Sequence, residues 1–136
     1  MADWRENLVE SSEGIASILA ETKRIAVLGI KTEVQRGEAA FYVPEYMAAA
    51  GYEIVPVPVY YPDVSEILGE PVYRTLAEIP EPVDMVNVFR RSHDIPRHVP
   101  DILAAHPKVV WIQTGITNDA AAEPLARAGI KVVQDR

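Results

Sequence analysis

Five short apolar runs recur along the chain, and within them apolar and polar residues do not alternate. The runs are residues 24–29, 53–57, 84–89, 109–112 and 130–133. Strands that are apolar on both faces are typical of a parallel sheet covered by helices. Helical segments between the runs complete a strand–helix alternation. The pattern predicts an α/β fold, a Rossmann-like doubly wound parallel sheet of five strands in a three-layer sandwich. Right-handed crossovers lead us to expect the strand order 3-2-1-4-5.

The segments between these runs carry the expected helices and one long connection. Helices are predicted over 3–22, with a later start near Glu13 as the alternative, and over 40–50, 95–105 and 118–128. In the second of these, the buried stripe is expected at Val43, Tyr46, Met47 and Ala50. The proline-rich residues 58–82 are expected to form a connection with a brief helix near 76–79. Trp111 is expected to be a core residue.

Length and composition indicate one globular domain, residues 1–136. Hydrophobic residues make up 49% of the chain and charged residues 24%, which is typical of a folded protein. No apolar run is long enough for a membrane span, and cysteine is absent, so we expect a cytoplasmic protein. The net charge of −7 repels nucleic acid and anionic membranes. It does not exclude a small phosphorylated ligand, because charges are screened over about 10 Å.

Positively charged residues follow two of the predicted strands. Lys31 comes directly after the first strand, Arg90 and Arg91 after the third, and Arg36 lies in the first loop. The carboxyl ends of parallel strands share one edge of the sheet, where ligands bind near the reversal of strand order. Guanidinium groups suit phosphate because their donors form a planar fork. The four cations therefore predict an anionic ligand, although each one alone is equally well explained as a solvated surface charge.

The turn after the first strand favours a nucleotide but not the commonest dinucleotide. Gly29 ends that strand, and the next glycine is Gly37, so the G-x-G-x-x-G pattern is absent. Gly29 serves either a tight strand exit or a close approach of phosphate. The second strand ends in Val57-Pro58-Val59-Tyr60, without the acid that holds the ribose of NAD. An adenine ring could lie against Val59 or Tyr60, or Tyr60 could simply pack the connection.

No residue pattern indicates a catalytic or metal site. Ser92, His93 and Asp94 are consecutive, so their side chains diverge, and Ser92 or Asp94 is more simply a helix N-cap. The three histidines lack the spacing of metal ligands. We find no nucleophile with a base. The sequence thus favours a binding site over a catalytic one.

Seven motifs that follow in order over residues 15–136 resemble the small stand-alone bacterial CoA-binding proteins, relatives of the CoA-binding domain of the succinyl-CoA synthetase alpha subunit. The matching segments are residues 27–29, 42–47, 51–57, 66–69, 84–91, 110–116 and 128–133.

The resemblance implies that coenzyme A or an acyl-CoA is held at the carboxyl edge of the sheet. Nucleotide contacts would come from Gly29, Ile30 and Lys31 and from the segment Val57-Pro58-Val59, with Phe89 and Arg90 matching a Phe-Arg pair of the family. Lys31, Arg36, Arg90 and Arg91 would hold phosphates, and the pantetheine arm would run toward Gly115.

The chain departs from the family pattern at three places. Ile30 and Lys31 replace a small residue and serine, and Pro58 replaces an asparagine that offers a side-chain donor and acceptor. The family continues beyond the positions of Asp135 and Arg136 with a cysteine and a short tail, and the sequence does not decide whether this chain is a truncated or processed form.

Two alternatives remain open at this point. One is an enzyme, either an NAD(P)-dependent oxidoreductase or a component of an acyl-CoA ligase. The other is a protein-interaction module with a vestigial nucleotide pocket.

Overall fold

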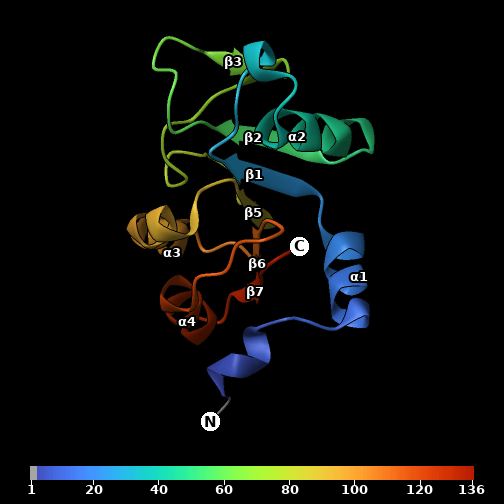
Figure 1. Ribbon diagram of the computed structural model, residues 1–136, viewed down its shortest axis with the longest axis vertical. Helices are drawn as coiled ribbons and strands as arrows, with labels where there is room; N and C mark the ends of the chain where they lie inside the picture. Colours follow the sequence, from blue (N-terminus) through green and yellow to red (C-terminus); the bar gives the residue numbers. More distant parts are fainter. Residues whose placement is uncertain (1–2) are drawn as a thin grey trace.

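The computed structural model describes residues 3–136 and contains a five-stranded parallel sheet between two layers of helices (Figure 1). The sheet order is β2-β1-β5-β6-β7. The strands are β1 Arg24–Leu28, β2 Glu53–Val57, β5 Met85–Val88, β6 Val109–Ile112 and β7 Lys131–Val133. The predicted α/β class and the Rossmann-like parallel sheet are confirmed.

The predicted strand order is wrong in one respect. Counted along the chain, the five strands lie in the order 2-1-3-4-5 instead of 3-2-1-4-5, because β5 pairs with β1, in register from Ile25–Met85 to Leu28–Val88. The handedness rule does not decide on which side of β1 the third strand lies. The connection over residues 58–84 is long enough to cross β1 and so permits this pairing. The order therefore reverses between β1 and β5.

Asp84, the residue before β5, holds the start of this strand against the start of β1. Its Oδ2 accepts hydrogen bonds from the backbone N–H groups of Lys23 and Arg24, each at 3.0 Å. The hydrogen bond from Arg24 is the largest cause that lowers the pKa of this carboxyl group, and Lys23 and the ammonium group of Lys108 act in the same direction against partial burial. The carboxylate thus favours the observed pairing.

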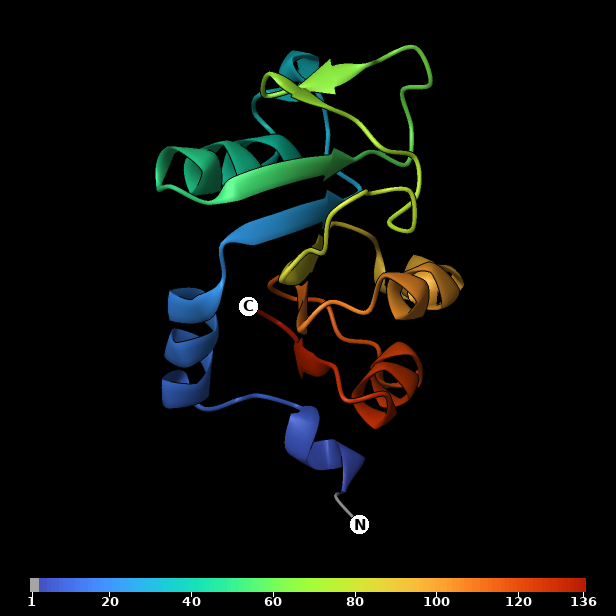
Figure 2. The ribbon, with the colours of Figure 1, turned by 180° about the vertical axis from the view of Figure 1, so that it is seen from behind.

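The helices cover both faces of the sheet. On one face, α3 Val99–Ala105 and α4 Asp119–Arg127 bury Ile102 and Leu125 against Ala26 and Val86 (Figure 2). On the other face lie α1 Ser12–Glu21 and α2 Ala39–Ala49, which bury Ile18 and Phe41 in a second cluster. Figure 1 shows α2 near β1 and β2 and α1 at the opposite end of the same face.

Several helix boundaries and faces differ from the prediction. The N-terminal segment forms the short 3-10 helix η1 Trp4–Asn7 and then α1, which begins after the N-cap Ser11. The predicted buried stripe of α2 is wrong, since that helix buries Ala40, Phe41 and Pro44 whereas Tyr46 is 75% exposed. The fourth helix is capped by Asn118 as predicted.

The remaining connections are less regular than expected. The 3-10 helix η3 Ser92–His98 precedes α3, and η2 Glu33–Gln35 lies after β1. The predicted helix at residues 76–79 is wrong, since this segment forms a single turn in which the Ile79 N–H donates to the carbonyl of Leu76. Asp101 of α3 holds the turn by accepting from the backbone N–H groups of Leu76 and Ala77. A small hairpin, β3 Glu66–Ile67 with β4 Glu70–Pro71, occupies part of this connection instead.

Within residues 3–136, the helices are all too short or too polar to cross a membrane.

Only glycine fits at position 29, because the backbone of Phe89 lies close to it. It has a φ of 88°, and a Cβ added there would lie 2.3 Å from the carbonyl oxygen of Phe89. Its N–H donates to the carbonyl of Val57 at 2.9 Å. The exits of β1, β2 and β5 thus meet at this residue, which makes it a structural glycine whatever binds beside it.

Replacing Asp84 by alanine should destabilise the fold by about 1–3 kcal/mol at neutral pH, because two backbone N–H groups lose their acceptor. A carboxyl group with a lowered native pKa stabilises the fold above its unfolded pKa of about 4 and loses this effect as the pH falls through the native value. Urea unfolding at pH 7 and at pH 3 should therefore show a smaller gap between wild type and variant at the lower pH. A gap that does not change with pH would contradict this role of the charge.

Replacing Gly29 by alanine should cost about 3 kcal/mol or more, because the left-handed backbone is strained and the Phe89 carbonyl must move. Gly51→Ala is the matched control, since Gly51 has a φ of 106° with nothing near its Cβ position. The control should cost about 1 kcal/mol. Equal losses for the two variants in urea unfolding would show that the Phe89 contact does not matter.

Candidate functional site

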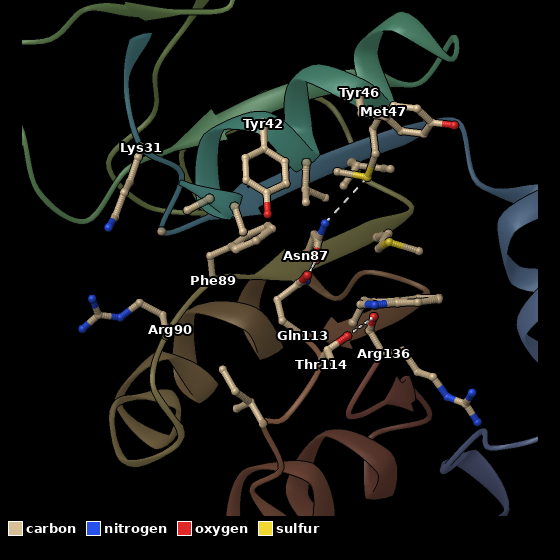
Figure 3. Close-up of a pocket in the computed structure, with 18 of the residues that line it drawn as sticks. Lys31, Tyr42, Tyr46, Met47, Asn87, Phe89, Arg90, Gln113, Thr114 and Arg136 are labelled. Atoms are coloured by element: carbon tan, nitrogen blue, oxygen red, sulfur yellow. Dashed lines mark hydrogen bonds between the residues drawn. The ribbon is translucent and has the colours of Figure 1, made fainter. Parts of the chain in front are cut away.

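A groove of about 990 Å³ crosses the sheet on the face that carries α1 and α2 (Figure 3). It begins at the carboxyl edge, where β1 and β5 end, and continues over β5 and β6 between the two helices. This size is typical of pockets for small ligands. The end of the groove at the carboxyl edge coincides with the reversal of strand order, the place where ligands bind in open α/β sheets.

Every charged side chain that lines this groove among residues 3–136 is a cation. These residues are Lys31, Arg90, Arg91 and Arg136. Lys31 and Arg90 lie together at the end of the groove by the exits of β1 and β5 (Figure 3). Lys31 forms an ion pair with Glu38 at the start of α2. Arg136 lies away from these two residues, and its guanidinium donates to the carbonyl of Glu10 (Figure 3). In a chain of net charge −7, cations gathered at the exits of β1 and β5 favour an anionic ligand there.

Arg90 is buried, at 8% exposure, and its orientation is set by two neighbours. Its NH1 donates to the hydroxyl of Tyr60 at 3.4 Å, and its guanidinium carbon lies 5.5 Å from the Tyr60 ring centroid. The hydrogen bond from Arg90 lowers the pKa of the Tyr60 phenol. Its NH2 lies 3.6 Å from the carboxylate of Asp94. The Nε group has no hydrogen-bond partner among residues 3–136, so a buried donor is left unused.

Asp94 is the centre of a cluster of cations and not a helix cap. Besides Arg90, it lies 3.5 Å from Arg91 and 3.1 Å from Arg97, and His93 is 3.6 Å away. Burial opposes its ionisation, but the charges of His93 and the three arginines lower the pKa of this carboxyl group. The N-cap of η3 is Arg91, so both predicted caps are wrong. Three guanidinium groups around one carboxylate leave the cluster positive.

The hydroxyl group of Ser92 has a structural contact. It donates to the carbonyl of Thr117 and lies against Asn118, so Ser92 anchors η3 to the start of α4. In the described part of the chain, no three His, Asp or Glu residues are grouped so that they could hold a metal ion.

The middle of the groove contains two amide side chains. Gln113 Nε2 donates to Asn87 Oδ1, and Asn87 Nδ2 lies 3.7 Å from the sulfur of Met47 (Figure 3). Sequence reasoning did not select either side chain as part of a site, although Gln113 lies on the expected carboxyl edge. The signal for Asn87 was a polar residue within an apolar strand that is buried on both faces. Trp111, predicted as core, is only partly buried and lines the groove.

The structure brings half of the predicted binding residues to the groove. Those that line it are Gly29, Lys31, Tyr60, Phe89, Arg90 and Arg91. The side chains of Ile30 and Val57 are buried in the core at 1% and 0% exposure, so only their backbone could face a ligand. Arg36 donates from Nε to the carbonyl of Glu33, within the loop after β1. Among the described residues, the groove lining also leaves out Pro58, Val59 and Gly115.

Known proteins show what this chain is similar to. The model of the CoA binding domain family matches residues 23–136. An uncharacterized protein of Bacillus subtilis, YneT, is 38% identical over 125 residues, which are 92% of this chain and 89% of that protein. A solved structure from Thermus thermophilus, cell-free ID.343, has a TM-score of 0.84 and 36% identity, and the match covers 93% of this chain and 92% of that one.

More distant structures share the fold alone. A dinucleotide-forming acetyl-coenzyme A synthetase of Ca. Korarchaeum cryptofilum has a TM-score of 0.62 at 17% identity, and the match covers 81% of this chain and 25% of the synthetase. The family match spans most of the chain and contains the whole carboxyl edge of the sheet. The chain therefore belongs to the CoA-binding domain family.

Proposed function

We propose that the groove binds coenzyme A or an acyl-CoA through its nucleotide and diphosphate part and performs no chemistry on it. The observation that carries the proposal is the lining, in which all charged side chains of the described residues are cations although the chain is acidic. Membership of the CoA-binding domain family supports the choice of CoA among anionic ligands.

The diphosphate is proposed to lie between Lys31 and Arg90. Both residues stand at the strand-order reversal, and Arg90 has an unused donor in Nε. The adenine end is proposed to lie near Tyr60, which is 57% exposed beside Arg90. Ile30 and Val57 would contribute backbone groups only, since their side chains are buried.

A binding role is supported by the chemistry of the lining. Within residues 3–136 its side chains include no carboxylate, histidine or serine, so the lining offers no nucleophile paired with a histidine or carboxylate base. An NAD-type site would also need an acid at the end of β2, where the chain has Val57 and the buried Pro58.

Lys31→Ala should weaken CoA binding about tenfold, because it removes one charge-assisted contact to phosphate. Isothermal titration of the folded protein with CoA measures this directly. Lys131→Ala is the matched control, since Lys131 begins β7 at the opposite edge of the sheet. Absence of binding to wild type at millimolar CoA would refute the proposed function, and equal effects of the two variants would refute the proposed phosphate position.

Arg90→Glu should destabilise the fold, because it would bury a second carboxylate beside Asp94, whose side chain is only 7% exposed. Arg91→Glu is the control at the next position, where the side chain is 76% exposed beside the same carboxylate, so water screens the reversed charge and the loss of stability should be smaller. Urea unfolding midpoints compare the two. If Arg90→Glu unfolds at the wild-type midpoint, Arg90 is not held as the structure shows.

A further inference from the structure

The groove continues well beyond its cationic end, and its character changes along the way. Past Asn87 and Gln113, its walls are mostly apolar, with Thr114 and Arg136 at the side (Figure 3). The Arg136 guanidinium turns away from the groove and donates to the carbonyl of Glu10. On the sheet, the partly buried Trp111 forms the floor together with Ile25 and Met85, which are almost fully buried. Leu19, Tyr46, Met47 and Tyr52 form the sides. We call these seven residues the apolar end of the groove.

The apolar end exists because α1 and α2 do not meet. Tyr52, just after α2, donates its hydroxyl to the carbonyl of Leu19 in α1 at 3.0 Å. This hydrogen bond ties the two sides together at the far end. Leu19 and Tyr46 keep 39% and 75% of their surface exposed around the hollow. Large exposed apolar side chains gathered around a hollow are typical of a binding site.

The middle of the groove contains a buried amide group whose N–H donor lacks a strong acceptor. The Asn87 side chain is buried at 3% exposure, yet in the described chain its Nδ2 group has only the sulfur of Met47 as an acceptor. Sulfur is a weak acceptor. A buried amide donor without an oxygen partner is a costly arrangement that a ligand amide could relieve.

We propose that the apolar end holds the acyl chain of an acyl-CoA. The groove is cationic at one end, carries amide groups in the middle and is apolar at the other end. An acyl-CoA has the same sequence of groups, with phosphates, then the two amides of the pantetheine arm, then a hydrocarbon chain. This inference rests on the proposed function and adds a ligand class to it, namely acyl-CoA with a chain long enough to leave water.

The test is an affinity series by isothermal titration with CoA, acetyl-CoA and octanoyl-CoA, all below micellar concentrations. Each methylene group buried on binding adds favourable free energy. Octanoyl-CoA is expected to bind at least tenfold more tightly than acetyl-CoA, and acetyl-CoA about as tightly as CoA. Equal affinities for all three ligands would overturn this inference and leave CoA binding intact. If none of the three binds, the proposed function fails as well.

Two substitutions at exposed positions, neither of which adds a charge, test where the acyl chain lies. Leu19→Gln and Tyr46→Gln are expected to reduce the preference for octanoyl-CoA over CoA at least threefold, whereas Ala48→Gln, an exposed position of α2 outside the lining, should keep it. An unchanged preference in both variants would overturn the placement. Light scattering of the unliganded protein adds one more outcome. A dimer that dissociates in Tyr46→Gln would show that a second copy covers the groove, which also overturns the inference.

Discussion

The pairing of β5 with β1 determines where every feature of the carboxyl edge lies. It brings the Phe89 carbonyl against Gly29, so that only a residue without a Cβ fits at the exit of β1. Lys31 and Arg90 follow these two positions by one or two residues and are therefore placed beside each other. Asp84 stabilises the same pairing at the other edge by binding the backbone of Lys23 and Arg24. The cationic end of the groove is thus a direct consequence of which strand lies next to β1.

Electrostatics at this edge depend on Asp94 as much as on the cations. Arg90 is almost fully buried, and a guanidinium group without a partner would be expensive at that depth. Asp94 and the ring of Tyr60 offset this cost and fix the direction of the side chain. Arg91 and Arg97 approach the same carboxylate from solvent, so the single acid does not cancel the local positive charge. The acidic remainder of the chain is distant and screened by salt.

That the cations share one edge of the sheet could be predicted from the sequence, because parallel strands end at the same edge in any order. That Lys31 and Arg90 are neighbours could not, because this depends on the pairing of β5 with β1. The order itself depends on the path of residues 58–84, which no local pattern specifies. The sequence also did not reveal the groove over the sheet. Its floor residues Met85 and Trp111 belong to strands that appear apolar on both faces, and that pattern predicts full cover by helices. Whether α1 and α2 meet over β5 and β6 is decided by tertiary packing. Asn87 was the one local sign that this face differs from a plain core.

The division of the site between loops and sheet follows from the chemistry of each part. Charged groups need water or opposite charges, and they find both at the loops of the carboxyl edge, where Lys31 and Arg91 remain partly solvated. Apolar contacts need a preformed surface, and Trp111 of β6 provides one with Leu19 and Tyr46 of the two helices, without any loop. A ligand that is anionic at one end and apolar at the other would therefore gain from both parts. A ligand with only the anionic end would leave Leu19, Tyr46 and Trp111 facing water, which gives this architecture a physical reason to prefer the amphipathic ligand.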